Sequence, residues 1–291
     1  MSRGGNLCVL ALTGCLVCGL TACGAQDGAG DGRVDVVSTS YPLAYVAEQV
    51  GGDRVEVTNL TPAGGDSHGL ELSPRDVVTI EAADVVVHLS GGLQPSVDEA
   101  LDQQEPGRLV DAAGLADRPE DPHFWLDPLR LAELAGQVSD GLAAADPDHA
   151  GDYAAAAERL TASLQELDDR YREVLAPCEG ATLLASHEAF GYLADRYGLR
   201  QIGVAGVDPH VEVSPARLRR VADEVRDTGA RTVFFEAAAG PGVAGTLAAE
   251  LGLATGVLHP VERVAEGETY RELMAQNLAA LRDGLVCDQS R

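Results

Sequence analysis

Residues 148–175 read DHAGDYAAAAERLTASLQELDDRYREVL. Leucine and alanine recur in this stretch at intervals of three and four residues, which is the pattern of one buried helix face. Asp146–Pro147 precedes the stretch and Pro177 follows it, and prolines at these places are helix boundary signals. The pattern predicts one helix of about 40 Å, at about 1.5 Å per residue. A coiled-coil partner helix is the alternative interpretation, but a rigid strut between two globular segments fits the flanking sequence better.

The segments on both sides of this helix alternate between short β-branched runs and helical patterns. Strands are expected at 34–38, 55–58, 84–89, 181–185, 201–204, 231–235 and 254–258. Such alternation is typical of parallel sheets with crossover helices. We therefore predict an α/β fold with two (β/α) parallel-sheet lobes: an N-terminal lobe at 33–147, the linking helix at 148–176 and a C-terminal lobe at 177–291.

The beginning of the chain has the features of a secretion signal followed by a tether. Residues 1–22 contain one base, no acid and an apolar stretch shorter than the roughly 20 residues of a membrane-spanning helix. Small residues precede Cys23, as they do at sites of lipid attachment. We expect 1–22 to be a lipoprotein signal peptide, Cys23 to carry the lipid that anchors an extracytoplasmic protein to the cell membrane, and 23–32 to be a flexible tether. A cleaved signal with a chance cysteine is the alternative.

The charge of the chain bears on its partners. It has 46 acidic and 21 basic residues, all of the latter arginine, and a net charge of −25. This charge repels phosphate backbones, so we expect no nucleic-acid partner. It attracts cations, including metal ions.

Two cysteines, Cys178 and Cys287, remain once Cys23 and the three in the signal are set aside. Outside the cytoplasm a pair of remaining thiols usually forms a disulfide. We predict that this disulfide joins the C-terminal helix to the C-terminal lobe, with two buried free thiols as the alternative.

Four of the seven histidines share a setting that the other three lack. They lie in loops after predicted strands, where α/β sheets bind ligands, and each lobe contributes two. A cleft between the lobes that gathered four imidazoles would suit tetrahedral Zn²⁺, whereas scattered loop and core histidines are the alternative. The four candidate ligands are His68, His123, His187 and His259, while His88, His149 and His210 are interpreted as structural or solvated.

Two longer motifs indicate a family. Residues 121–128 (DPHFWLDP) and 186–193 (SHEAFGYL), the latter followed by RYGL at 196–199, resemble signatures of the zinc- and manganese-binding lipoproteins that serve metal ABC importers. Weaker similarities to the same family include Phe234–Glu236 and the last helix. Together with the two motifs they occur in the family's order along nearly all of the mature chain.

The resemblance implies two (β/α) lobes, a rigid linking helix, and a metal ion in the cleft. Three ligands carry over to His68, His123 and His187. The fourth is normally an acid, where this chain has His259; we expect His259 to be a direct ligand, with Glu262 or water as alternatives. The long histidine-rich loop of many zinc-binding members is missing, because 111–122 is short and acidic.

The expected function is capture of Zn²⁺ and its delivery, by a monomer, to a metal ABC permease and its ATPase. Mn²⁺ is the alternative ion, although three or four imidazoles favour zinc. A zinc hydrolase, with Glu71 or Glu188 as base, is a less favoured alternative because neither residue has the spacing of a hydrolase motif. A surface adhesin or a metal-handover chaperone is a third class.

Overall fold

The computed structural model describes residues 32–103, 107–118, 120–237 and 239–287. The chain divides into two units at Gly32, and the description below concerns the unit that begins at Arg33. None of the helices in the described residues is long and apolar enough to cross a membrane. Residues 1–31, which include the expected signal peptide and Cys23, lie outside the described residues.

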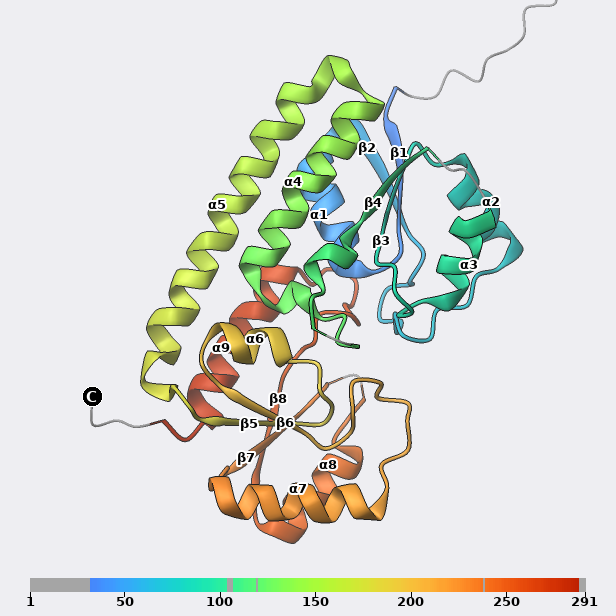
Figure 1. The fold of residues 1–291 in the computed structure, drawn as a ribbon. Coiled ribbons are helices and arrows are strands. Elements are labelled where there is room, and N and C mark those ends of the chain that lie inside the picture. Colours follow the sequence, from blue (N-terminus) through green and yellow to red (C-terminus); the bar gives the residue numbers. More distant parts are fainter. Residues whose placement is uncertain (1–31, 104–106, 119, 238, 288–291) are drawn as a thin grey trace, which may run out of the picture. The chain divides into compact units, whose positions relative to one another are not determined.

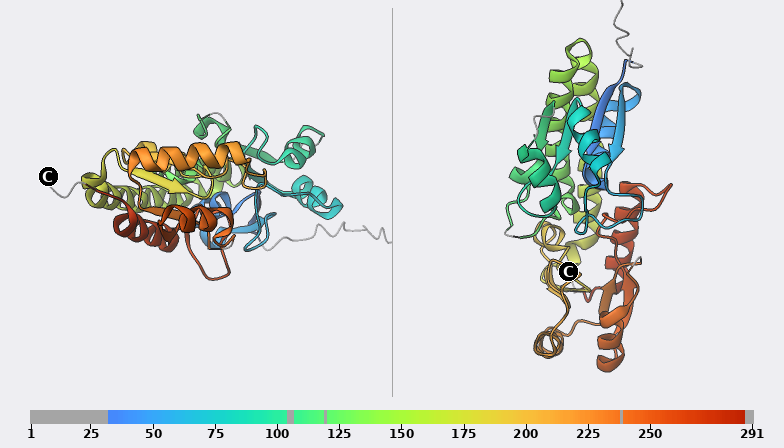
Figure 2. Two further views of the ribbon diagram at one scale, coloured as in Figure 1. Left: turned by 90° about the horizontal axis from the view of Figure 1, so that it is seen from below. Right: turned by 90° about the vertical axis from the view of Figure 1, so that its right-hand side faces the viewer.

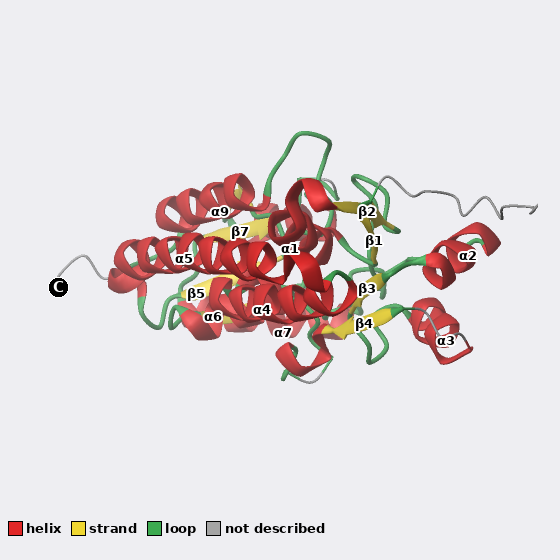
Figure 3. Cartoon of the chain, turned by 90° about the horizontal axis from the view of Figure 1, so that it is seen from above, coloured by secondary structure: helices red, strands yellow, loops and turns green. Residues whose placement is uncertain are grey.

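The first lobe contains a four-stranded parallel sheet of order β2-β1-β3-β4. Its strands are β1 (Val34–Ser38), β2 (Val55–Asn59), β3 (Val85–His88) and β4 (Arg108–Asp111), and its helices are α1 (Tyr41–Gly51), α2 (Pro74–Ala82), α3 (Pro95–Gln103) and α4 (Pro128–Ala145). Helices α2 and α3 lie on one side of the strands, and α1 and α4 lie on the other (Figure 3). Both faces of β3 are therefore buried, which explains its unbroken run of valines.

The second lobe repeats this topology, with a parallel sheet of order β6-β5-β7-β8. Its strands are β5 (Thr182–Ala185), β6 (Arg200–Gly203), β7 (Thr232–Phe235) and β8 (Ala254–Val257), and its helices are α6 (Gly191–Arg196), α7 (Pro215–Thr228), α8 (Gly242–Leu251) and α9 (Tyr270–Gly284). Helices α7 and α8 cover one face of this sheet, where Leu184, Ile202 and Val233 form a core with them (Figure 2).

The predicted two-lobe α/β class is confirmed, and the expected strands are present within one or two residues at their ends. The strand β4 was not expected from sequence. It lies at the edge of its sheet, and only Val110 of its four residues is buried, so it lacks the apolar pattern of the other strands. Short 3₁₀ helices occur at η1 (Gly52–Arg54), η2 (Ala112–Leu115), η3 (Phe124–Leu126), η4 (Pro147–His149) and η5 (Ala176–Cys178).

The long helix α5 (Ala150–Leu175) runs beside α4 and ends near the second sheet (Figure 1). Its first predicted residues, 148 and 149, belong instead to η4. Near its C-terminal end, Tyr171 stacks on Tyr197 and donates a hydrogen bond to the carbonyl of Met274 at 2.6 Å. These contacts attach α5 to both α9 and the end of α6.

A continuous apolar cluster extends through both lobes, from Val36 and Val85 to Leu183 and Phe234. Trp125 is fully buried in this cluster, donates a hydrogen bond from Nε1 to the carbonyl of Pro260 at 2.8 Å, and accepts one at its own carbonyl from Tyr270 at 2.7 Å. These hydrogen bonds fix η3 against the second lobe. They thereby also fix His123, which directly precedes η3.

Candidate metal centre

Three loops from different parts of the chain bring the side chains of His68, His123 and Glu262 together. One donor atom from each of these side chains lies within 4.8 Å of the other two. His123 and Glu262 are buried, and His68 is partly buried. Two imidazole nitrogens and a carboxylate oxygen at this separation form a donor set for a divalent cation such as Zn²⁺.

Each histidine of this group follows an aspartate that fixes its backbone. Asp66 Oδ1 accepts a hydrogen bond from the His68 N–H at 2.9 Å, and Asp121 Oδ1 accepts one from the His123 N–H at 3.1 Å. Such Asx turns hold a loop without support from a sheet or helix. Aspartate two residues before histidine is a short-range signal from which this local geometry could be predicted.

Glu262 reaches the group because of an unusual turn after β8. Val261 has a φ of 62°, a conformation that β-branched residues rarely adopt. Glu262 Oε1 then lies 2.6 Å from His123 Nε2, and Oε2 lies 3.4 Å from His68 Nε2. Ser67 Oγ donates a hydrogen bond to Oε2 at 3.1 Å. The strained turn is thus used to bring a carboxylate of the second lobe to histidines of the first.

Opposite charges stabilise this buried group. Burial disfavours the imidazolium, but the Glu262 and Asp121 carboxylates outweigh it and raise the pKa of His123 to about 9. Burial also disfavours the carboxylate, but His123 and His68 hold the pKa of Glu262 well below its usual value. Glu262 Oε1 has no aligned hydrogen bond from any described residue, which fits an atom positioned to bind a cation. A proton and a metal ion would compete for His123 Nε2.

His187 lies beside the group, in the loop that directly follows β5. It is almost fully buried, and its ring packs edge to face against His123 with the centroids 5.7 Å apart. Its Nδ1 lies 2.7 Å from Glu236 Oε1, at the end of β7. Glu236 therefore faces one ring nitrogen of His187.

His259, which we expected to be the fourth ligand, is outside the group of donor atoms. Both polar atoms of its backbone bond to the side chain of Asn277 on α9, its N–H to Oδ1 and its carbonyl to Nδ2, each at 2.7 Å. Its position is set by α9, and the turn at Val261 directs Glu262 toward the histidines instead. The donor group therefore contains Glu262, one of the alternatives for the fourth ligand, and does not contain His259.

Comparison with known proteins agrees with these features. The sequence model of the family "Zinc-uptake complex component A periplasmic" (ZnuA) matches residues 36–284. The high-affinity zinc uptake system protein ZnuA of Bacillus subtilis is 31% identical over 291 residues, covering 90% of this chain and 91% of that protein. The chain belongs to the ZnuA family.

Other relatives of the family are longer or carry different descriptions. The zinc-binding lipoprotein AdcA of Streptococcus pneumoniae R6 is 32% identical over 90% of this chain, but the chain spans only 58% of that protein. The Zn(II)-bound ZnuA-like domain of S. pneumoniae AdcA superimposes with a TM-score of 0.76 at 33% identity, covering 89% of this chain and all of that domain. The laminin-binding protein Lbp of Streptococcus pyogenes gives a TM-score of 0.79 at 28% identity, covering 87% of this chain and all of that one.

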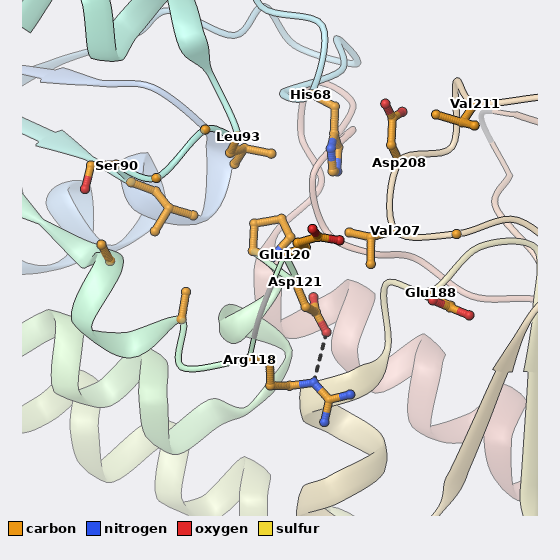
Figure 4. Close-up of a pocket in the computed structure, with 17 residues that line it drawn as sticks. His68, Ser90, Leu93, Arg118, Glu120, Asp121, Glu188, Val207, Asp208 and Val211 are labelled. Atoms are coloured by element: carbon orange, nitrogen blue, oxygen red, sulfur yellow. Dashed lines mark ion pairs between the residues drawn. The ribbon is translucent and has the colours of Figure 1, made fainter.

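A cavity of about 660 Å³ opens beside His68 and is lined by both lobes of this ZnuA-family chain (Figure 4). Its walls include Glu120, Asp121, Glu188 and Asp208 as well as apolar side chains. Ala113, Arg118 and Glu120, from the short segment after β4, also line this cavity.

The remaining sequence candidates, and Asp127 of the 121–128 motif, take structural positions. Glu188 pairs with Arg217, and Asp127 caps α4 by accepting the Leu129 N–H at 2.9 Å. His88 is buried in β3, as expected. His149 pairs with Asp146, His210 pairs with Asp66, and Glu71 is exposed.

Cys178 and Cys287 form a disulfide, with their Cα atoms 4.2 Å apart and a sequence separation of 109. The bond joins η5 to the segment that follows α9. This is the pairing predicted from sequence.

Proposed function

We propose that this chain captures Zn²⁺ outside the cytoplasm and delivers it to a metal ABC permease and its ATPase. The observation that carries the proposal is the buried group of His68, His123 and Glu262, whose donor atoms come from both lobes and lie within 4.8 Å of one another. A site of this kind, formed by loops of two lobes that share one apolar core, suits binding and release of an ion.

The proposed ligands are His68, His123, His187 and Glu262. Three neutral imidazoles and one carboxylate around Zn²⁺ give a net charge of about +1, compared with about +2 for the four-histidine alternative. His187 completes the set because its ring lies against that of His123 and its Nδ1 is directed at Glu236. His259 has no ligand role in this proposal.

The donor set also bears on ion choice. Imidazole suits Zn²⁺ better than Mn²⁺, which prefers oxygen ligands and higher coordination numbers. Glu262 supplies one oxygen, so Mn²⁺ is the alternative ion, bound more weakly. A titration of the purified mature domain with each ion, in competition with a chelator of known affinity, tests this order.

We propose that the protein catalyses no reaction. For the hydrolase alternative, one candidate base is unsuitable, because Glu188 is paired with Arg217, which also donates to the Val204 carbonyl. Turnover of ester or peptide substrates by the zinc-bound protein would support the hydrolase instead.

The decisive experiment is metal analysis with matched variants. Elemental analysis and anomalous diffraction at the zinc edge should find one Zn²⁺ per chain, bound between the two lobes. His123→Ala and His187→Ala should weaken zinc binding strongly. His149→Ala is the matched control, since His149 lies in η4, pairs with Asp146 and is not part of the group of donor atoms. Equal zinc binding by all three variants would contradict the proposal.

We further propose that the chain acts as a monomer and that a lipid on Cys23 holds it to the membrane. The proposed segments are a signal peptide at 1–22, a tether at 23–32, lobes at 33–147 and 177–291, and a linking helix at 148–176. A surface adhesin is the alternative role. Impaired growth of a deletion strain under zinc limitation, restored by added zinc, supports uptake.

A further inference from the structure

The two sequence motifs at 121–128 and 186–193 contact each other at Asp121. This carboxylate is about 95% buried. Its Oδ1 accepts two hydrogen bonds from His123, one from the backbone N–H at 3.1 Å and one from Nδ1 at 2.8 Å. An imidazole whose Nδ1 carries the donated hydrogen presents the lone pair of Nε2, and Nε2 is the nitrogen that lies 2.6 Å from Glu262.

The other carboxylate oxygen of Asp121 faces a residue that is not part of the group of His68, His123 and Glu262. Asp121 Oδ2 lies 3.3 Å from Arg118 Nε (Figure 4). Arg118 is fixed in turn by the second lobe: its backbone N–H donates to Tyr192 Oη at 2.9 Å, and its guanidinium pairs with Asp195. Both of these partners lie on α6.

Gly191, at the start of α6, packs directly on this ion pair. A Cβ at this position would lie 2.5 Å from Asp121 Oδ2 and 2.8 Å from Arg118 Nε, closer than atoms can approach. The φ of Gly191 is not in the left-handed region, so its backbone conformation does not require glycine. The lack of a side chain here leaves room for the Asp121 carboxylate.

We propose that Asp121 is a positioning residue for zinc capture, and that Arg118 and Gly191 hold its carboxylate so that His123 presents Nε2 to the ion. This inference rests on the proposed function for its ligand, and its physical basis is the orientation of a metal-binding histidine by a carboxylate on the opposite ring nitrogen. Asp121, Arg118 and Gly191 thereby also link His123 of the first lobe to α6 of the second.

The proposal predicts the same result from two independent variants. Asp121→Ala removes the carboxylate that accepts from His123. Gly191→Ala displaces this carboxylate but removes no charged group from the protein. Each should weaken zinc affinity by about 10- to 100-fold, the usual effect of losing such a carboxylate. Asp121→Asn should lose less zinc affinity than Asp121→Ala, because the amide oxygen of asparagine can still accept a hydrogen bond from His123 Nδ1. The controls are Asp117→Ala, which removes an exposed carboxylate paired with Arg130, and Gly136→Ala, where a Cβ meets no atom within 4 Å.

A second measurement separates positioning from a merely structural role. Long-range ¹H–¹⁵N spectra should be recorded on the metal-free Glu262→Ala variant, because Glu262 otherwise faces Nε2 at 2.6 Å and competes with Asp121 for the ring proton. Where the imidazole is neutral, the His123 proton should lie on Nδ1 in this variant and shift toward Nε2 when Asp121→Ala is added. An unchanged tautomer, or zinc affinity equal to wild type in both Asp121→Ala and Gly191→Ala, would overturn the proposal. If wild type itself binds no zinc, the proposed function fails, but the tautomer measurement still decides the role of Asp121.

Discussion

At the scale of single residues, the turn at Val261 determines which side chain after β8 reaches His68 and His123. The positive φ at this residue separates two neighbours with different roles: His259 is attached to Asn277 on α9, and Glu262 faces the histidines. Because the two differ in charge, the choice between them also changes the charge of the bound complex.

Glu262→Gln should therefore weaken zinc binding, whereas His259→Ala should leave it close to wild type. The amide keeps the shape of Glu262 but removes the negative charge, and we expect a loss of at least about tenfold, the lower end of the effect of changing even an outer-shell partner. Chelator competition on both variants measures this. Normal affinity in Glu262→Gln together with a large loss in His259→Ala would restore the four-histidine site.

The ion pair of His123 and Glu262 predicts opposite pH trends for stability and for zinc affinity. The pKa of His123 is raised to about 9, so the pair stabilises the metal-free protein fully below the usual histidine pKa of about 6.5. This contribution is lost as pH rises toward the folded pKa, while zinc affinity rises because the competing proton leaves. Thermal melting of the metal-free protein and zinc titrations over this range measure both trends. Glu262→Gln should shift the rise in affinity to lower pH.

At the scale of elements, helix α5 is joined to α6 through one buried carboxylate. Asp168 is fully buried and accepts from Arg196 Nε at 2.7 Å, from Arg172 Nε at 2.8 Å and from Tyr197 Oη at 3.1 Å. Arg196 also lies 3.1 Å from Asp127, the cap of α4. One charge cluster therefore connects α4, α5 and α6.

Asp168→Ala should destabilise the protein by about 3–5 kcal/mol, because it leaves the arginine charges without their buried partner. Burial opposes ionisation, but Arg196 and Arg172 lower the pKa of Asp168, so the cluster stabilises the fold above the usual aspartate pKa and loses this effect as pH falls through the folded value. Denaturant unfolding measures the change. Asp169→Ala, on the exposed side of the same turn, should stay within about 0.5 kcal/mol of wild type.

The disulfide between Cys178 and Cys287 connects the start of the second lobe to the segment after α9. Because it closes a loop of more than 100 residues, the chain-entropy model gives it about 4–5 kcal/mol at most. A Cys178→Ser/Cys287→Ser double variant should unfold at lower denaturant concentration while keeping its zinc affinity, since neither cysteine is in the metal group. Two alkylatable thiols in denatured, unreduced wild type would show that the bond does not form.

For the molecule as a whole, the net charge of −25 has the sign that suits the cation site proposed here. The acidic surface favours approach of divalent ions at low ionic strength.

Anchoring by Cys23 predicts that the full chain partitions into detergent and that Cys23→Ala appears as soluble or unprocessed protein. The physical reason is that diacylation supplies about 0.8 kcal/mol of membrane affinity per buried CH₂, and nothing in the described helices replaces it. Phase partitioning of both forms in the producing bacterium measures this. Equal partitioning would exclude the lipid anchor.

The two-lobe α/β class, the long helix and the disulfide pair could be predicted from the sequence, because they depend on local periodicity and on short motifs. The same motifs placed His68 and His123 in loops that the structure brings together. β4 was missed since an exposed edge strand carries little apolar pattern. Asp121 was missed as a partner of His123, although the Asp-x-His spacing was visible.

The grouping of Glu262, rather than His259, with His68 and His123 could not be predicted from sequence, and neither could the approach of Gly191 to Asp121. Both outcomes depend on backbone direction over a few residues: a positive φ at Val261, and the approach of α6 to the segment after η2. Residues so far apart in sequence are brought together by the shared apolar cluster of the two lobes, which no local pattern encodes. The loops that carry these side chains could be located from sequence, but which side chain of each loop points inward follows from packing.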